Sequence, residues 1–265
     1  MGAFHDFEHR GWQKAAAYYA GSFGELTARA AEPLLDAARV GQGTRVLDVA
    51  TGPGYVAAAA ARRGAVVEAI DFAPEMVALA RRLHPALAVR EGDAEALADA
   101  AASHDAVVMS FGLLHLERPE AAIAEAHRVL APGGRYAFTV WAPPAQARGF
   151  GIVLEAMAAH GRLDVGLPEG PPFFRFGDPA ESRGALAAFG EIEVATLPLV
   201  WRLRSPDQLF EAALRGGVRT SAVMQAQTPE ALAAIRNAIA LACATYADGD
   251  GFAIPMPVIL ASAVR

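Results

Sequence analysis

The sequence predicts an α/β fold built on an open, mostly parallel sheet. Between residues 44 and 141, short apolar strands alternate with alanine-rich helices, which is the pattern of repeated βαβ units. At 265 residues the chain is long enough for one α/β domain of ordinary size with added elements. We expect a single domain with N-terminal lid helices in residues 1–40, a core over residues 41–141, and further strands with lid insertions in residues 142–265.

The elements of the core follow in order along the chain. Apolar runs predict strands near residues 45–50, 65–71, 87–91, 105–110 and 134–140. Helical patterns lie between them near residues 54–63, 74–83 and 119–130. Pro74 and Pro119 suit the first turns of the second and third of these helices, and Pro132-Gly133-Gly134 ends the third and turns into the next strand.

Outside the core the pattern changes. Residues 11–40 predict two helices, and the Gly- and Pro-rich stretch 143–179 predicts an irregular cover. Residues 191–204 and 252–264 each predict one strand, with mainly helical residues 206–247 between them. We expect these pieces to form a lid over the carboxyl ends of the strands, where open parallel sheets bind ligands.

Composition argues against several classes of protein. The net charge is −6 and the basic residues are scattered, which disfavours a nucleic-acid partner. The single cysteine, Cys243, cannot form an internal disulfide and fits a reducing compartment. The first residues lack the basic start and apolar run of a secretory signal, and no stretch reaches the roughly 18 apolar residues of a membrane span. We expect a cytoplasmic protein that binds a small molecule and, because its histidines lack ligand spacing, no metal. The sequence leaves the oligomeric state open.

The run V-L-D-V-A-T-G-P-G over residues 46–54 predicts a buried strand, a tight glycine turn and a helix start, a junction suited to a nucleotide-like ligand. Two cofactors compete for it. The turn matches G-x-G-x-x-A, and Asp71 lies 19 residues beyond Gly52, which favours NAD. Asp48, just before the turn, favours a cation, because a pyrophosphate prefers a helix N-terminus without an adjacent carboxylate.

Acids follow three successive predicted strands. Asp71 could accept hydrogen bonds from two ribose hydroxyls, and Asp93 could accept one from an adenine amino group. Together with Asp48, these acids match an adenosyl amino acid that carries an ammonium and a sulfonium group. S-adenosylmethionine has both.

Five motifs in register extend this pattern. They are D-V-A-T-G-P-G at 48–54, D-F-A-P-E-M at 71–76, E-G-D-A at 91–94, H-D-A-V-V-M-S-F-G at 104–112 and R-V-L-A-P-G-G at 128–134. Together they resemble class I S-adenosylmethionine-dependent methyltransferases, most closely the branch with quinone C-methyltransferases and small-molecule methyltransferases. The resemblance implies a doubly wound, Rossmann-like sheet of seven strands with the last strand antiparallel.

The resemblance also implies a cofactor site. It places the methionine end over Asp48 and the loop at 50–54, the ribose at Asp71, and the adenine against Phe72, Met76, Asp93 and Ala94. The full expected set is Tyr19, Asp48, Ala50, Thr51, Gly52, Gly54, Asp71, Phe72, Met76, Asp93, Ala94 and Ser110. In two positions the chain departs from the family: Ala50 replaces a glycine, which strand-like backbone angles would tolerate, and Ala73 replaces a helix-capping serine.

His115 is the candidate general base, because it follows the fourth strand at the edge that faces the transferring methyl group in this fold. The expected acceptor pocket comprises Trp12, Tyr18, His115, Trp141 and Phe173. The predicted activity is methylation of a small molecule on oxygen or carbon, with S-adenosylhomocysteine as the product of the cofactor. Two alternatives stay open: an NAD-dependent oxidoreductase, and a noncatalytic protein that binds S-adenosylmethionine.

Overall fold

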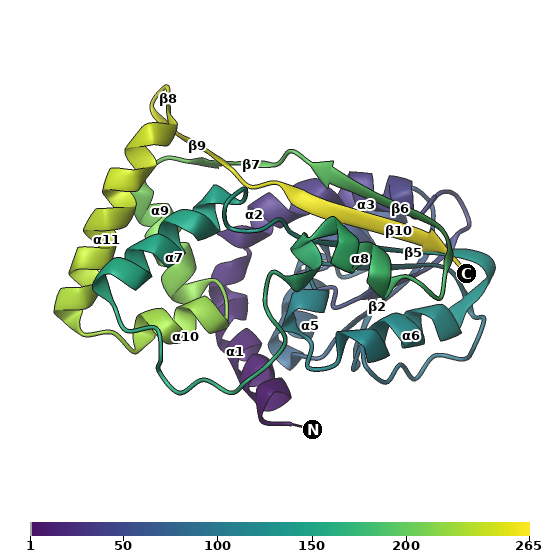
Figure 1. The fold of residues 1–265 in the computed structure, drawn as a ribbon. Helices are drawn as coiled ribbons and strands as arrows, with labels where there is room; N and C mark the ends of the chain where they lie inside the picture. The colour runs from purple at the N-terminus through teal and green to yellow at the C-terminus, as the bar shows by residue number, and fades with distance from the viewer. Residues whose placement is uncertain (1) are drawn as a thin grey trace.

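The computed structural model describes residues 2–265, and its main sheet runs through the right half of Figure 1. The sheet has seven strands in the order β3-β2-β1-β4-β5-β10-β6. Their bounds are β1 Arg45–Val49, β2 Val66–Asp71, β3 Ala88–Glu91, β4 His104–Ser110, β5 Leu130–Trp141, β6 Gly190–Leu197 and β10 Val258–Val264. Strands β1 to β5 run parallel to one another, and β10 runs antiparallel to both β5 and β6. The predicted seven-stranded sheet with an antiparallel last strand is therefore confirmed.

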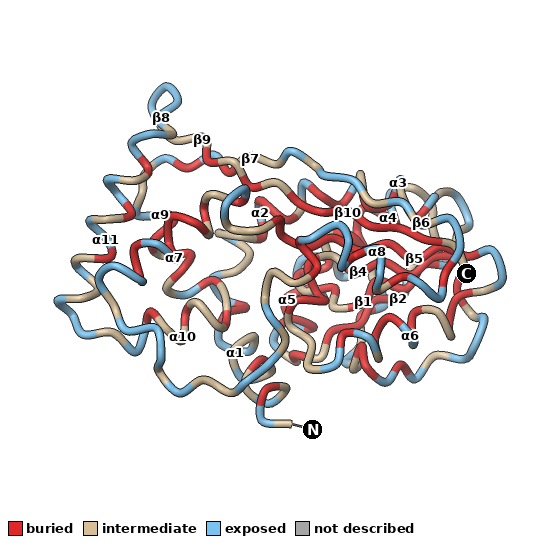
Figure 2. Tube along the Cα trace, in the orientation of Figure 1, coloured by how far each residue is buried: buried red, intermediate tan, exposed pale blue. Residues whose placement is uncertain are grey.

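Helices cover both faces of this sheet, so its central strands are buried on both sides. The core helices are α3 Ala31–Ala37, α4 Tyr55–Arg62, α5 Pro74–Leu83 and α6 Pro119–Val129. Successive side chains of β1 enter different packing clusters: Val46 packs with α3 and α4, whereas Leu47 and Val49 face the opposite cluster. Figure 2 shows this buried centre as a block of red strands.

The predictions of one strand each at residues 191–204 and 252–264 are wrong in one respect. In the structure, each of these strands is broken at a proline. Pro198 separates β6 from β7 Val200–Leu203, and Pro257 separates β9 Gly251–Pro255 from β10. Proline has no backbone N–H for a strand ladder, so pairing stops there. Beyond the breaks, β7 and β9 form a second sheet with β8 Ala247–Asp248.

The stretch 143–179 is more regular than the sequence predicted, because it contains helix α7 Arg148–His160. Its two early glycines mark close packing rather than a turn. A Cβ on Gly149 would lie 2.7 Å from the sulfur of Met256, and one on Gly151 would lie 2.5 Å from the carbonyl oxygen of Pro144. The rest of the stretch contains a short 3₁₀-helix at Arg175–Gly177, and α8 Pro179–Ala185 begins where the stretch ends.

The N-terminal region also differs from the prediction of two helices in residues 11–40. Helix α1 spans Ala3–Tyr19 and begins well before residue 11, and α2 Phe23–Thr27 and a short 3₁₀-helix lead into α3. Figure 1 shows α1 between the main sheet and a helical group on the left. That group consists of α7, α9 Pro206–Arg215, α10 Arg219–Gln225 and α11 Pro229–Cys243.

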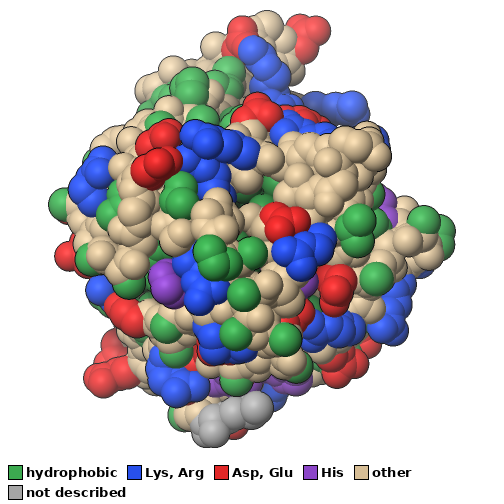
Figure 3. Space-filling view, turned by 90° about the vertical axis from the view of Figure 1, so that its right-hand side faces the viewer, with side chains coloured by type: hydrophobic (Ala, Val, Ile, Leu, Met, Phe, Trp, Pro, Cys, Tyr) green, Lys and Arg blue, Asp and Glu red, His purple; other side chains and the backbone are tan. Residues whose placement is uncertain are grey.

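Acidic and basic side chains are interspersed on the face shown in Figure 3, with no broad area of one sign on that face. Within residues 2–265, no helix is both long enough and apolar enough to cross a bilayer. Over the same range, His, Cys, Asp and Glu side chains do not gather in groups of three or more that could hold a metal ion.

Candidate functional site

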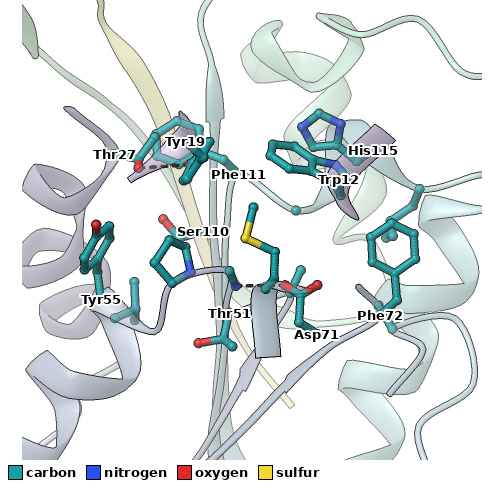
Figure 4. Close-up of a pocket in the computed structure, with 18 of the residues that line it drawn as sticks. Trp12, Tyr19, Thr27, Thr51, Tyr55, Asp71, Phe72, Ser110, Phe111 and His115 are labelled. Carbon is teal, nitrogen blue, oxygen red and sulfur yellow. Dashed lines mark hydrogen bonds between the residues drawn. The ribbon is translucent and has the colours of Figure 1, made fainter. Parts of the chain in front are cut away.

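The first pocket lies at the carboxyl ends of β1, β2, β3 and β4, where loops follow each strand (Figure 4). About 890 Å³ of space between its lining residues is free of protein atoms, and this figure includes open solvent at the mouth. All of its lining residues lie within residues 5–116. Among these described residues none is Lys or Arg, whereas Asp71 and Asp93 both line the pocket.

The loop after β1 forms the floor of this pocket. Gly52 has a φ of +53°, and a Cβ there would project into open space, so this position lets a ligand approach the backbone. Ala50 has a φ of +55°, which corrects the expectation of strand-like angles at this position. A left-handed backbone at alanine costs about 1–2 kcal/mol, so the loop stores strain where it meets the pocket.

Asp48 lies beneath this loop and does not line the pocket. Its carboxylate accepts hydrogen bonds from Thr51 Oγ1 at 2.6 Å and from the backbone N–H of Ala57 at 3.0 Å, both through Oδ2. Its Oδ1 is buried and has no hydrogen-bond partner among the described residues. Burial raises the pKa of Asp48 to about 7, although these two hydrogen bonds oppose the shift.

Asp71, at the end of β2, ties two neighbouring loops together. Its Oδ2 accepts from the backbone N–H of Gly52 at 2.8 Å and its Oδ1 from that of Ala73 at 2.9 Å. Burial raises the pKa of Asp71 to about 6 against the effect of these hydrogen bonds. A carboxylate has further lone pairs, so Asp71 keeps acceptor capacity for a ligand in the pocket.

The far side of the pocket is suited to a flat ring. Phe72 lies there and is contacted edge-on by the His5 imidazole, at 5.6 Å between ring centroids. Both ring nitrogens of His5 are buried without a hydrogen-bond partner in the described structure, and Nε2 lies 3.9 Å from the Asp93 carboxylate. Met76 and Ala94 also line this pocket.

A second pocket of about 670 Å³ adjoins the first on the side of the helical group. Aromatic side chains dominate its wall: Trp12, Tyr19, Phe23, Phe111, Trp141, Phe150 and Phe173. The rings of Phe23 and Phe150 stack at 5.7 Å, and those of Phe111 and Trp141 lie 4.3 Å apart. Such a cavity favours a flat, largely apolar ligand.

The two pockets share a wall made of Trp12, Tyr19, Thr27, Phe111 and His115. In Figure 4, Tyr19 and Thr27 lie on one side of Phe111, and His115 and Trp12 lie together on the other. The hydroxyls of Tyr19 and Thr27 are 3.0 Å apart. Burial raises the pKa of Tyr19 to about 12, so this phenol stays protonated at neutral pH and cannot serve as a base there.

The shared wall is connected to the end of β4 by a residue with strained backbone angles. Phe111 follows β4 with a φ of +57°, and a Cβ on the next residue, Gly112, would lie 2.8 Å from Cβ of Ala50. Gly112 is therefore required for the close approach of the β1 and β4 loops. The short 3₁₀-helix Leu113–His115 begins immediately afterwards and presents the imidazole of His115 to both pockets.

His115 is held by a buried carboxylate. Its Nδ1 lies 2.9 Å from Oε2 of Glu8, which is on α1 and has no exposed surface. The other oxygen of Glu8 accepts from Nε of Arg219 at 2.8 Å. The ring of Trp12 contacts the imidazole edge-on at 4.7 Å.

The structure brings most of the predicted site residues together. Lining the first pocket are Tyr19, Ala50, Thr51, Gly52, Asp71, Phe72, Met76, Asp93, Ala94 and Ser110. Gly54 lies behind the loop with a φ of +83° and faces His84 and Ala80. Of the expected acceptor residues, Trp12, His115, Trp141 and Phe173 line the second pocket. Tyr18 lines neither of these two pockets: it is half exposed, and its ring lies beside Arg215.

Several residues that line the pockets or contact a lining residue escaped the sequence analysis. His5 and Glu8 precede the predicted start of the first helix, and Phe150 lies in the stretch predicted to be irregular. The spacing of His5, Trp12 and Tyr19, seven residues apart, is a signal that could have revealed a pocket-facing side of α1. Nothing in the sequence indicates that Arg219 reaches Glu8.

Residues 47–138 match the family model described as a methyltransferase domain. A demethylmenaquinone methyltransferase of Thermus thermophilus is 44% identical over 115 residues, which cover 41% of this chain and 52% of that protein. The chain spans about half the length of the curated relatives it matches first.

Two solved structures share the fold at 17% identity. One is the YcgJ protein of Bacillus subtilis, with a TM-score of 0.57 over 89% of this chain and 98% of that one. The other is Phospholethanolamine N-methyltransferase 2 of Haemonchus contortus, in complex with phosphomonomethylethanolamine and S-adenosylhomocysteine, with a TM-score of 0.56 over 100% of this chain and 60% of that one. Residues 47–138, which contain the five motifs, are therefore similar to a methyltransferase domain.

Proposed function

We propose that the protein transfers the methyl group of S-adenosylmethionine to a small aromatic acceptor that carries a hydroxyl group. The single observation that carries this proposal is the pair of adjoining pockets, one bordered by acids and one by aromatic rings, with His115 in their shared wall. The choice of cofactor is supported by the methyltransferase domain and by the Haemonchus contortus relative, whose structure is a complex with S-adenosylhomocysteine.

The chemistry of the first pocket fits this cofactor. A cationic adenosyl amino acid would find two carboxylates in the wall and the unpartnered Oδ1 of Asp48 beneath the loop. Asp71 would accept from the ribose hydroxyls, while Phe72 and Met76 would pack on the adenine with Asp93 and Ala94 at its edge. Bound there, the cofactor supplies an activated methyl group on a sulfonium.

The NAD alternative fits this pocket poorly. A pyrophosphate would meet acids and, within the described lining, no Lys or Arg to balance its charge. The family model that matches residues 47–138 is described as a methyltransferase domain, which favours methyl transfer over an oxidoreductase or a noncatalytic role.

The second pocket fits the acceptor. Its aromatic wall would hold a planar ring, and His115, which lines the same pocket, would accept the proton of a hydroxyl on that ring. Relatives named demethylmenaquinone methyltransferases support a quinol-like or phenolic acceptor, methylated on oxygen or on ring carbon. In the transfer step the protein aligns the acceptor with the methyl group and excludes water. Together these effects can lower the activation barrier by about 7–11 kcal/mol.

Calorimetry and mass spectrometry test the proposal. We expect saturable binding of S-adenosylhomocysteine and none of NADH, and a mass shift in one or more phenols or naphthols incubated with methyl-labelled S-adenosylmethionine. Binding of NADH alone would overturn the assignment of the cofactor. Binding of S-adenosylhomocysteine without transfer to any acceptor of a broad panel would favour the noncatalytic role.

Two further expectations extend this proposal. The scattered basic residues and the acidic net charge favour a small molecule over a nucleic acid as the partner. A cytoplasmic location, expected from the single cysteine, is proposed with it.

A further inference from the structure

Glu8 makes two contacts with residues far away in the sequence. It is on α1, it is fully buried, and it contacts His115 after β4 and Arg219 at the start of α10. A buried carboxylate is costly unless each oxygen is paired, and here each oxygen has one strong partner. The cluster of Glu8, His115 and Arg219 therefore joins α1, the segment after β4 and the start of α10.

The cluster fixes the direction of each hydrogen bond. The guanidinium of Arg219 can only donate, and it also donates to the carbonyl oxygens of Pro171 at 2.6 Å and Leu114 at 2.8 Å. Glu8 as a carboxylate can only accept, so the Nδ1 of His115 must donate to it. A neutral imidazole with hydrogen on Nδ1 has its lone pair on Nε2.

We propose that Glu8, held by Arg219, is a positioning residue that keeps His115 in the tautomer whose Nε2 accepts a proton from the acceptor. This inference rests on the proposed function and deepens it. In the transfer to oxygen, the acceptor's hydroxyl proton passes to Nε2 while its oxygen forms a bond to the methyl carbon and the carbon–sulfur bond breaks. The electron pair of that bond stays on sulfur, which becomes a neutral thioether. The imidazolium faces the Glu8 carboxylate and later releases its proton to water.

The position of Glu8 on α1 adds a second consequence. His5, Trp12 and Tyr19 on the same helix line the first pocket, so the helix that closes this pocket also supplies the partner of the base. His115 is therefore correctly oriented only while α1 is docked. This arrangement couples closure of the site over the cofactor to assembly of the base.

Glu8→Gln is the decisive variant because it preserves shape and changes hydrogen-bond direction. An amide has one acceptor oxygen, which the Arg219 guanidinium requires, so the amide NH₂ would face Nδ1 of His115. That contact makes Nδ1 an acceptor and moves the hydrogen to Nε2, which removes the basic lone pair from the pocket. In a serine protease, replacing the aspartate that pairs with the catalytic histidine by asparagine lowers the activity, because the histidine then adopts the wrong tautomer.

The test reads the tautomer directly by ¹⁵N NMR of the imidazoles at alkaline pH, with the His115 signals assigned from their absence in His115→Gln. We expect hydrogen on Nδ1 in the native protein and on Nε2 in Glu8→Gln. We also expect Glu8→Gln to lower kcat for methyl transfer to a responsive phenol or naphthol by about 10²–10⁴-fold while the Kd for S-adenosylhomocysteine stays within about twofold. Glu8→Asp, which keeps a carboxylate, should retain the native tautomer and more of the activity.

Glu117→Gln is the matched control. Glu117 also anchors α1, by accepting from the backbone N–H of Gly2 at 3.1 Å, but it lines neither pocket. Hydrogen on Nε2 of His115 in the native protein would overturn the inference even if Glu8→Gln failed to fold. An unchanged tautomer together with an unchanged kcat in Glu8→Gln would also overturn the inference. Absence of transfer to any acceptor by the native protein would refute the proposed function instead, and the spectra would still decide whether Glu8 sets the tautomer.

Discussion

The backbone N–H of Gly52 donates a hydrogen bond of 2.8 Å to the carboxylate of Asp71, which joins the loop after β1 to the end of β2. Asp71 therefore has two tasks in this site. It holds the glycine loop in its left-handed conformation, and it offers its remaining lone pairs to the pocket.

Asp71→Asn should weaken binding of the cofactor more than it lowers kcat at saturating cofactor. The amide keeps one acceptor oxygen, and its NH₂ opposes the N–H of Gly52 or Ala73. A lost charge-assisted hydrogen bond is worth about 1.5–3 kcal/mol, so the Kd for S-adenosylhomocysteine should rise about 10- to 150-fold by calorimetry. Glu91→Gln, an exposed acid at the end of β3, should leave the Kd unchanged. An unchanged Kd in Asp71→Asn would contradict the ribose contact.

His115→Ala should lower kcat by about 10²–10⁴-fold, because no other side chain in the shared wall is placed to accept the acceptor's proton. The Kd for S-adenosylhomocysteine should change little, which calorimetry can check. The control is His127→Ala, whose imidazole packs against Phe189 away from both pockets. Equal losses of turnover and cofactor affinity in His115→Ala would indicate a structural role for His115.

Ala50→Gly should stabilise the ligand-free protein by about 1 kcal/mol, because glycine adopts a φ of +55° without the penalty that a Cβ imposes. Urea unfolding followed by circular dichroism measures this change. Ala78→Gly, at an exposed position within α5, should instead destabilise the protein by about 1 kcal/mol. A loss of stability in both variants would show that the Ala50 methyl contributes more by packing than its backbone costs.

Affinity for S-adenosylmethionine should rise with pH between about 5 and 8. Burial raises the pKa of Asp48 to about 7 and that of Asp71 to about 6, and a bound cation favours their ionised forms. Calorimetry in buffers of different ionisation enthalpy should detect release of protons on binding below pH 7. Asp48→Asn should remove the upper part of this dependence. An affinity that is flat across this range would contradict a cationic ligand beside these acids.

The same two acids set the stability of the ligand-free protein. Their folded-state pKa values lie above the ordinary value of 3.8, so their protonated forms are favoured by folding. Their stabilising contribution is complete below about pH 4 and is lost as the pH rises through 6 and then 7. Urea unfolding at several pH values should show this fall in the ligand-free protein and a smaller one with saturating S-adenosylmethionine.

Val153→Phe should separate the two pockets functionally. Val153 is buried in the wall of the second pocket and does not line the first, so a larger side chain fills only the acceptor space. The KM for a responsive naphthol should rise about tenfold or more, and the Kd for S-adenosylhomocysteine should stay unchanged. Loss of cofactor binding in a folded Val153→Phe variant would argue against separate pockets.

Local patterns were sufficient to predict the core and its loop. The strand, glycine turn and helix from Val46 onward depend on neighbours in sequence, and the structure places them as predicted. The positive φ of Ala50 was missed: Ala50 packs against Gly112, which is 62 residues away in the chain, and local patterns do not reveal such a contact. The contact of Glu8 with Arg219 spans 211 residues and leaves no trace in spacing or periodicity. The strand breaks at Pro198 and Pro257 could have been predicted, since each proline stood inside an expected strand.

The pairing of β7 with β9 brings the two ends of the intervening segment close together. Leu203 and Phe252 face one another in this pair, so the chain leaves and returns at adjacent points. The segment between them supplies Leu209, Ala212 and Arg219 to the second pocket, whereas the first pocket is complete within residues 5–116. Insertions whose ends lie close together are readily replaced. Exchange of this segment would therefore rebuild one side of the second pocket and leave every residue that lines the first pocket in place.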